Sequence, residues 1–227
     1  MILFIKLLLA HLLGDFYLQP KSWVEAKERD KLRSFITYAH ASLHGVLAYA
    51  LVWEKAFLPY AVAIALVHLC IDAIKVYAQK TETKRAWFLI DQSADVLSLI
   101  AVTLIYYQDS ISWVPWGRKE WVLLTAIVLL TRPTAFLVGI VISRWGNQTN
   151  NDNSLEDAGF IIGVIERLMV FTFVVTDHWE GVGLLVAAKS ILRLQDDRRL
   201  TEYVLVGTLL SFGIAVLSGM AYLSIAT

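Results

Sequence analysis

The chain has 227 residues, of which 57% are hydrophobic and 18% are charged, with 20 basic and 20 acidic side chains. Soluble domains average about 45–50% apolar and about 25% charged residues, so the composition argues against an ordinary soluble domain. The balanced charge gives no basic surface for nucleic acid, and we find no nucleotide-binding loop. We therefore expect an all-α, polytopic membrane protein without a nucleic-acid partner.

Taken in chain order, the apolar runs cover residues 2–18, 36–53, 57–78, 89–107, 121–142, 158–177, 181–195 and 202–225. A bilayer core takes about 20 helical residues, so the first and seventh runs are short and either span or re-enter. We expect seven or eight spans. The first run lacks a basic leader and a small-residue cleavage site, which predicts a retained helix.

Lysine and arginine are concentrated in alternate loops of this predicted bundle. Basic residues gather at 19–35 and 79–88, with Arg144 in loop 143–157 and Arg198 and Arg199 after the seventh run. The intervening connections hold few. Because positive loops stay in the cytoplasm, both termini are expected outside and the basic loops inside.

Residues 1–107 carry four pairs of metal-binding residue types, one in each of the first four runs. The pairs are spaced four residues apart, so each shares one helix face. They are His11 with Asp15, His40 with His44, His68 with Asp72, and Asp91 with Asp95. With the predicted orientation, all four lie in the cytoplasmic half of the membrane.

A single intramembrane histidine is usually a hydrogen-bonded helix contact, and one such pair arises easily by chance. Four pairs at one depth are different, because buried ionisable groups in lipid cost at least ~2.5–3.5 kcal/mol each and mark function. They favour a site for one or two divalent ions, namely zinc, manganese or iron, over a proton relay or a structural polar network. Gln19, Lys75 and Gln92 stand close enough to support the ligands, although Lys75 would equally reach the interface.

Residues 108–227 form a second predicted region without an intramembrane histidine. Its charged residues within apolar runs either form an internal salt-bridge network or grip an anion. They are Arg132, Glu166, Arg167, Lys189 and Arg193.

The four motifs, with Gln19, Lys75 and Gln92, resemble an uncharacterised bacterial membrane-protein family known as a domain of unknown function. That domain has the size of residues 1–107, and the second half resembles the extension of its longer members. More loosely, the paired motifs are similar to those of membrane-bound metal-dependent hydrolases, where a histidine is usual at the position of Asp95. The resemblance implies a location in the bacterial inner membrane.

Two functions of different classes follow from these residues. The first is a metal-dependent hydrolase of a lipid-linked or membrane-adjacent ester or phosphoester, with Asp95 as the catalytic base. The second is a transporter or channel for metal ions or protons; a membrane subunit with a structural or sensory metal is a third reading. The expected partners are membrane lipid, a small-molecule or lipid-linked substrate, and a second copy of the chain in a homo-oligomer.

Overall fold

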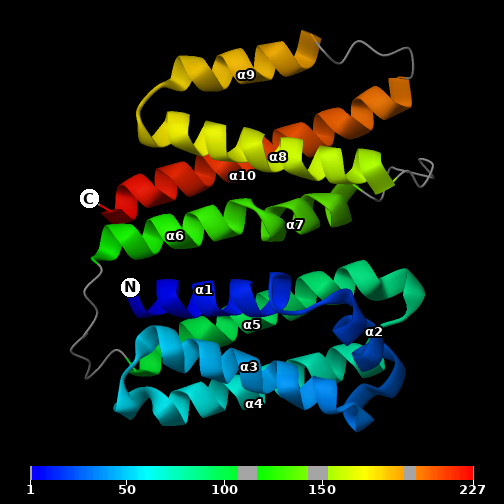
Figure 1. Cartoon of the computed structure of the whole chain (residues 1–227), viewed down its shortest axis with the longest axis vertical. Coiled ribbons are helices and arrows are strands. Elements are labelled where there is room, and N and C mark those ends of the chain that lie inside the picture. The colour runs from blue at the N-terminus through cyan, green and yellow to red at the C-terminus, as the bar shows by residue number, and fades with distance from the viewer. Residues whose placement is uncertain (1, 107–116, 143–152, 192–197, 227) are drawn as a thin grey trace. The chain divides into compact units, whose positions relative to one another are not determined.

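The structure is a computed structural model that describes residues 2–106, 117–142, 153–191 and 198–226, excluding the side chains of 153–158, 198–204 and 226. Its described elements are helices, without a strand among them, which confirms the all-α prediction (Figure 1). The contacts divide the chain into two compact units, Met1–Gly117 and Arg118–Thr227. The predicted boundary after residue 107 falls in 107–116, outside the described residues.

The first unit is built from five α-helices and three short 3-10 turns. Local sequence accounts for some of their ends: Ser34 Oγ accepts a hydrogen bond from Ile36 N at 3.2 Å and caps one helix, and Pro59 stands in the first turn of another. The elements are α1 (Ile2–Phe16), α2 (Lys21–Asp30), η1 (Lys31–Arg33), α3 (Phe35–Val52), η2 (Lys55–Phe57), α4 (Leu58–Ala78), η3 (Thr81–Thr83) and α5 (Lys84–Tyr106).

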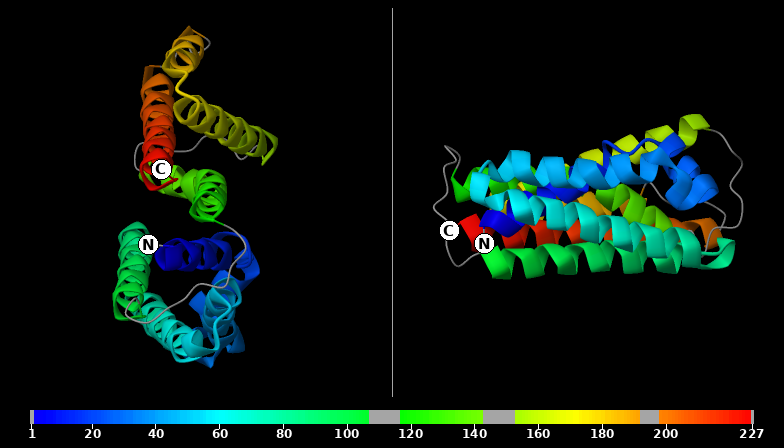
Figure 2. Two further views of the ribbon diagram at one scale, coloured as in Figure 1. Left: turned by 90° about the vertical axis from the view of Figure 1, so that its left-hand side faces the viewer. Right: turned by 90° about the horizontal axis from the view of Figure 1, so that it is seen from below.

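Four of these helices close into a ring. Helix α1 contacts α3 and α5, and α4 contacts the same two helices. The end-on view of Figure 2 shows this arrangement in the part coloured blue to green. Gly45 lets α3 and α4 approach closely, because a Cβ there would lie 2.8 Å from the carbonyl oxygen of Ala61. The ring thus has an interior that all four helices share.

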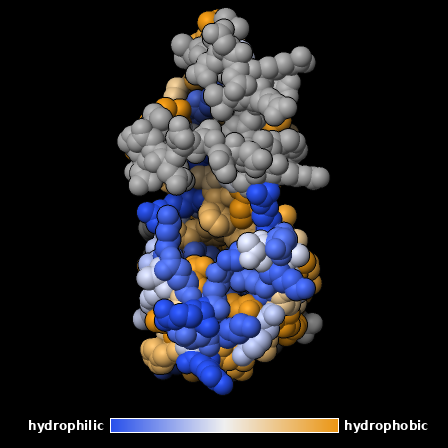
Figure 3. Space-filling view, turned by 90° about the vertical axis from the view of Figure 1, so that its right-hand side faces the viewer, coloured by the Kyte–Doolittle hydropathy of each residue, from blue (hydrophilic) through white to orange (hydrophobic). Residues whose placement is uncertain are grey.

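The interior of the ring is apolar at one end and polar at the other. The apolar end is filled by a cluster of buried side chains that includes Leu7, Val52, Phe57 and Leu99. The polar end lies toward α2, which leaves α1 at a bend of 80° and contacts α3. Figure 3 looks onto that end, where hydrophilic residues gather. This end of the ring therefore faces a hydrophilic surface.

The second unit contains α6 (Arg118–Leu130), α7 (Arg132–Ile142), α8 (Asn153–Val175), α9 (Trp179–Ile191) and α10 (Arg198–Ala226). Its buried core joins side chains of α6, α8 and α10, among them Leu130, Val170 and Phe212. Helices α6 and α7 are separated by a break at Thr131, next to Pro133, which has no N–H to donate to Leu129. Thr134 Oγ1 donates to that carbonyl instead, at 2.7 Å.

Within the described residues, five helical segments are long and apolar enough to cross a membrane, or six if the bent pair α1–α2 counts as one span. The expected seven or eight spans are not supported. Segments α1 and α2 are separated by the 80° bend, and α9 has only 13 residues. The prediction treated each apolar run as one membrane span, because the hydropathy of a run does not show where a helix bends or ends.

Candidate metal centre

The four predicted pairs meet in the polar end of the first unit. His11 and Asp15 lie in the last turns of α1, and His68 and Asp72 in the second half of α4. The pairs of α3 and α5 begin in the first halves of those helices and end near their middles. The side chains of the four pairs are buried, except that of Asp15, which is nearly buried. The prediction that the two members of each pair share one helix face is thus confirmed, and these faces point into the ring.

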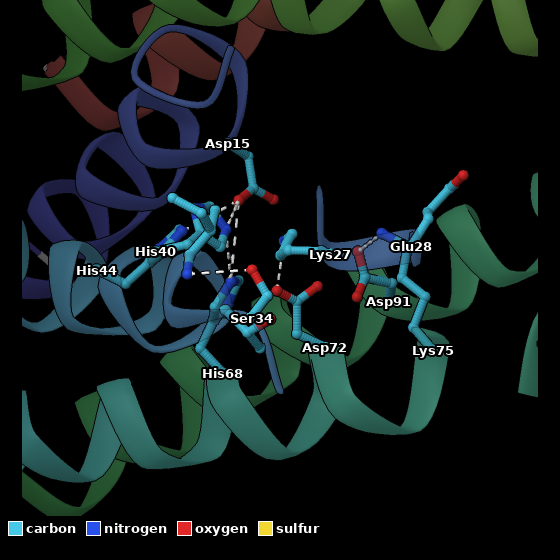
Figure 4. A network of polar contacts seen from close by, with 12 residues as sticks. Asp15, Lys27, Glu28, Ser34, His40, His44, His68, Asp72, Lys75 and Asp91 are labelled. Atoms are coloured by element: carbon cyan, nitrogen blue, oxygen red, sulfur yellow. Dashed lines mark hydrogen bonds and ion pairs between the residues drawn. The ribbon is translucent and has the colours of Figure 1, made fainter. Parts of the chain in front are cut away.

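Three histidines surround one carboxylate oxygen. Oδ1 of Asp15 lies 3.0 Å from Nε2 of His44, 3.2 Å from Nε2 of His40 and 4.0 Å from Nε2 of His68 (Figure 4). The Nε2 atoms of His40 and His68 lie 3.1 Å apart, and the rings of His44 and His68 stack with centroids 3.8 Å apart. We call this group the nitrogen-rich set: Asp15, His40, His44 and His68.

The nitrogen-rich set has the dimensions of a tetrahedral metal site. With bonds of about 2.0–2.2 Å, the ligand atoms of a tetrahedral ion lie about 3.3–3.6 Å apart. Three of the separations described above are 3.0–3.2 Å, and the fourth is 4.0 Å. Each residue of the set can offer an atom within 4.8 Å of the others. These residues therefore fit a divalent ion with small adjustments of the rings.

His68 is oriented by Asp95 from the opposite side of its ring. Its Nδ1 lies 2.9 Å from Oδ1 of Asp95. An ionised carboxylate only accepts hydrogen bonds, so Nδ1 carries a proton, and in the neutral ring the lone pair is then on Nε2, the nitrogen that faces His40 and Asp15. A histidine that binds a metal through one nitrogen usually donates the other N–H to such a partner. Asp95 can thus serve the site by holding His68 as well as by binding an ion.

Gln92 links His11 to two carboxylates. Its Nε2 donates to Oδ2 of Asp15 at 2.6 Å and lies 3.4 Å from Oδ2 of Asp91. The amide oxygen is left to accept, and it lies 3.2 Å from Nε2 of His11. His11 therefore donates from Nε2, so its Nδ1 is the nitrogen that remains for a metal. Among the possible ligand groups, His11 occurs with His68 and Asp95 but not in the nitrogen-rich set.

Two carboxylates of the cluster are paired with lysines. Asp72 forms an ion pair with Lys27 of α2, and both side chains are buried. Asp91 Oδ2 accepts from Lys75 Nζ at 2.6 Å. Asp72 belongs to none of the possible ligand groups among the described residues, so its predicted role as a ligand stays a prediction.

Lys27 is the residue that the sequence did not indicate, because it stands in a segment expected to be a basic loop. The number of acidic residues in the predicted pairs could have indicated that a further lysine or arginine lies beside them. At the polar end of the ring, the carboxylates of Asp15, Asp72, Asp91 and Asp95 would otherwise face one cation, Lys75. A buried carboxylate needs a counter-charge, so a second cation had to come from a neighbouring segment.

The remaining predicted residues lie apart from these sets. Nε2 of Gln19 is buried and has no hydrogen-bond partner among the described residues, and its role in supporting a ligand stays a prediction. In the second unit, Glu166 pairs with Lys189 rather than with an arginine. Arg167 is buried and donates to backbone carbonyls, and Arg193 lies outside the described residues. Arg132 opens α7.

One comparison with known proteins matches the part of the chain that contains the cluster. The sequence model of a family described as a protein of unknown function, DUF3307, matches residues 3–124, which is more than half of the chain. That stretch contains every residue of the four pairs. Neither the curated proteins nor the solved structures give a significant match.

Proposed function

We propose that this chain, which belongs to the DUF3307 family, is a membrane-embedded metal-dependent hydrolase. Its substrate would be a lipid-linked or membrane-adjacent ester or phosphoester, cleaved at the polar end of the first unit. The observation that carries the proposal is the convergence of three imidazole Nε2 atoms on Asp15 Oδ1 in a buried site. Imidazole and carboxylate together suit zinc, iron or manganese.

The charges of the interior support a resident cation. At the polar end of the ring, four carboxylates face two ammonium groups, Lys27 and Lys75, which leaves two negative charges in excess there. Either one divalent ion or protons on two histidines would balance them. The Nε2 atoms of His40 and His68 lie 3.1 Å apart, so these two rings would repel one another if both were protonated, which favours the divalent ion.

A bound divalent ion would supply Lewis-acid chemistry and lower the pKa of a water molecule. The residues of the chain would do the rest. Asp95 keeps one oxygen, Oδ2, unbonded to any described residue, so with a single ion bound it can take a proton from that water while Oδ1 holds His68. Lys27 and Lys75 supply positive charge beside the site, as a substrate that carries a phosphate requires.

The apolar end of the ring argues against the transporter reading. A permeation path needs polar groups across the membrane, whereas Leu7, Val52 and Phe57 fill the half beyond the cluster. The apolar surface of the unit, with residues such as Leu66 and Leu104 exposed, suits contact with lipid tails. We place the polar end on the cytoplasmic side of a bacterial inner membrane, following the basic loops.

The test combines metal analysis with a substrate screen. We expect the purified full-length protein to hold at least one equivalent of zinc, manganese or iron and to hydrolyse p-nitrophenyl phosphate or a lipid phosphoester. The double variant His40→Ala, His68→Ala should lose both properties, and Cys70→Ala, an exposed site, should keep them. Full metal content in the double variant would refute the proposal. Metal with ion flux in vesicles but no hydrolysis would favour the transporter instead.

A further inference from the structure

Beside the nitrogen-rich set, the polar end contains a second group of possible ligands that is made of carboxylates alone. Asp15, Asp91 and Asp95 each offer an oxygen, and these oxygens lie within 4.8 Å of one another. Asp15 belongs to both groups. Its Oδ1 faces the histidines, whereas its Oδ2 is turned toward Gln92 and α5. One carboxylate thus stands between two different coordination environments.

Two oxygens of this second group are buried without any bond. Oδ1 of Asp91 and Oδ2 of Asp95 have no hydrogen-bond partner among the described residues, although the residues are only 4% and 2% exposed. An unsatisfied buried acceptor costs about 1–3 kcal/mol, and more when it is charged. A pair of such oxygens in one place is therefore unexpected unless something binds there.

We propose that Asp15, Asp91 and Asp95 form a second cation position, which shares Asp15 with the nitrogen-rich set. This inference deepens the proposed function and rests on it. The ligands are all oxygens, so the position suits a hard ion such as Mn²⁺ or Mg²⁺ rather than Zn²⁺. A carboxylate that bridges two ions holds them about 3.5–4 Å apart, the spacing of two-metal hydrolytic sites.

The contacts already present leave room for this ion. Lys75 Nζ and Gln92 Nε2 both approach Asp91 through Oδ2, at 2.6 and 3.4 Å, so Oδ1 is still available. Asp95 uses only Oδ1 for His68. Gln92 fixes Asp15 by donating to Oδ2, and its amide oxygen can turn to the ion if His11 moves away. The ion would then be bound by the unbonded oxygens of Asp91 and Asp95, together with Asp15.

The charge of the doubly loaded site indicates the substrate class. One divalent ion cancels the two excess negative charges of the interior, so a second ion leaves the site with two positive charges. A phosphate monoester carries close to two negative charges near neutral pH. Two ions therefore match a phosphomonoester, whereas one ion suits a neutral ester.

The experiment uses the full-length protein in detergent, stripped with a chelator and reloaded with one equivalent of Zn²⁺. Mn²⁺ is then titrated, free Mn²⁺ is read by electron paramagnetic resonance, and retained zinc is read by elemental analysis. We expect one Mn²⁺ to bind while Zn²⁺ stays. In Asp91→Asn, Zn²⁺ loading should be unchanged and the Kd for Mn²⁺ should rise at least tenfold.

Two further variants keep the test decisive. Asp91→Asn with Lys75→Met removes both charges of the pair, and covers the case in which a lone Lys75 prevents folding; it should lose Mn²⁺ in the same way. Glu28→Gln, which alters a carboxylate paired with Lys84, should bind Mn²⁺ like the wild type. Absence of Mn²⁺ binding, displacement of Zn²⁺, or wild-type binding by both Asp91 variants would overturn the second position alone. Failure of the wild type to load Zn²⁺ would overturn the proposed function as well.

Discussion

Nδ1 of His68 lies 2.9 Å from a carboxylate oxygen of Asp95, while the opposite nitrogen of the ring faces His40 and Asp15. The carboxylate therefore decides which nitrogen of His68 is available to a metal. Asp95, on one side of the ring, thus controls the basicity and the orientation of Nε2, the ligand atom on the other side.

Asp95→Ala should weaken zinc binding by about 10–100-fold, because His68 loses the acceptor that fixes its tautomer and its orientation. Asp95→Asn should retain part of the affinity, since its amide oxygen still accepts from Nδ1. Zinc affinity can be measured by competition with a chromophoric chelator. Leu97→Ala, an exposed site on the same helix, is the control. Unchanged affinity in Asp95→Ala would show that the ring is held by other contacts.

Gly14→Ala should disturb the centre without touching a ligand. A Cβ at Gly14 would lie 2.6 Å from Cε1 and 2.7 Å from Nε2 of His44, so the ring has to move. We expect a loss of zinc affinity of at least tenfold in the same competition assay. The matched control is Gly139→Ala, because nothing described lies within 4 Å of a Cβ there. Equal affinity for both variants would mean that His44 is not held in the observed position.

Lys27→Met should destabilise the first unit by about 3–5 kcal/mol, because it leaves Asp72 as a buried charge without its partner. The double variant Lys27→Met, Asp72→Asn should recover much of the loss. Thermal unfolding followed by circular dichroism would measure both. Lys21→Met, an exposed lysine of the same helix, should leave the melting temperature within error. If the double variant were as unstable as the single one, the ion pair would not explain the effect.

Arg167→Met should destabilise the second unit. The guanidinium donates to the carbonyl oxygens of Leu130 at 2.5 Å and Thr131 at 3.2 Å, and to Ser211 Oγ at 3.2 Å. Each buried acceptor left unsatisfied costs about 1–3 kcal/mol. Arg167→Lys should not restore stability, since one ammonium group cannot reproduce the planar fork. A melting temperature equal to that of Arg118→Met, a change at an exposed arginine, would contradict this role.

The orientation is tested by labelling an introduced cysteine. In a Cys70→Ala background, Asp30→Cys should react with an impermeant maleimide only after the inner membrane is permeabilised, because the basic segment 19–35, which forms α2 and η1, is expected inside. A permeant maleimide serves as the control for reactivity. Strong labelling in intact cells would reverse the orientation and place the polar end of the first unit on the outer side.

Much of the first unit could be predicted, because the spacing of residues along a helix and their distance from its ends can be read directly from the sequence. The spacing of His40 and His44, and of Asp91 and Asp95, was enough to predict that each pair shares a face and that the faces meet. Helix content followed from hydropathy and from the demands of the bilayer on backbone groups. The family resemblance likewise agrees with the match over residues 3–124.

The contacts within the cluster could not be predicted, because they depend on how the helices cross. Spacing treats Asp72 and Asp95 alike, yet one pairs with Lys27 and the other supports His68. Lys27 becomes buried through the 80° bend between α1 and α2, which leaves no mark in hydropathy. The same bend accounts for part of the excess in the predicted number of spans.

The bonds of Arg167 set an order of events during synthesis. Arg167 follows Leu130 by 37 residues in the chain. At about 5–20 residues per second, the ribosome makes that stretch in about 2–7 s. During this interval the carbonyl of Leu130 has no donor among the described residues of α6 and α7, whereas that of Thr131 already accepts from Ala135 N at 3.1 Å. We therefore expect the α6–α7 segment to remain in contact with water or with the insertion machinery until α8 has been synthesised.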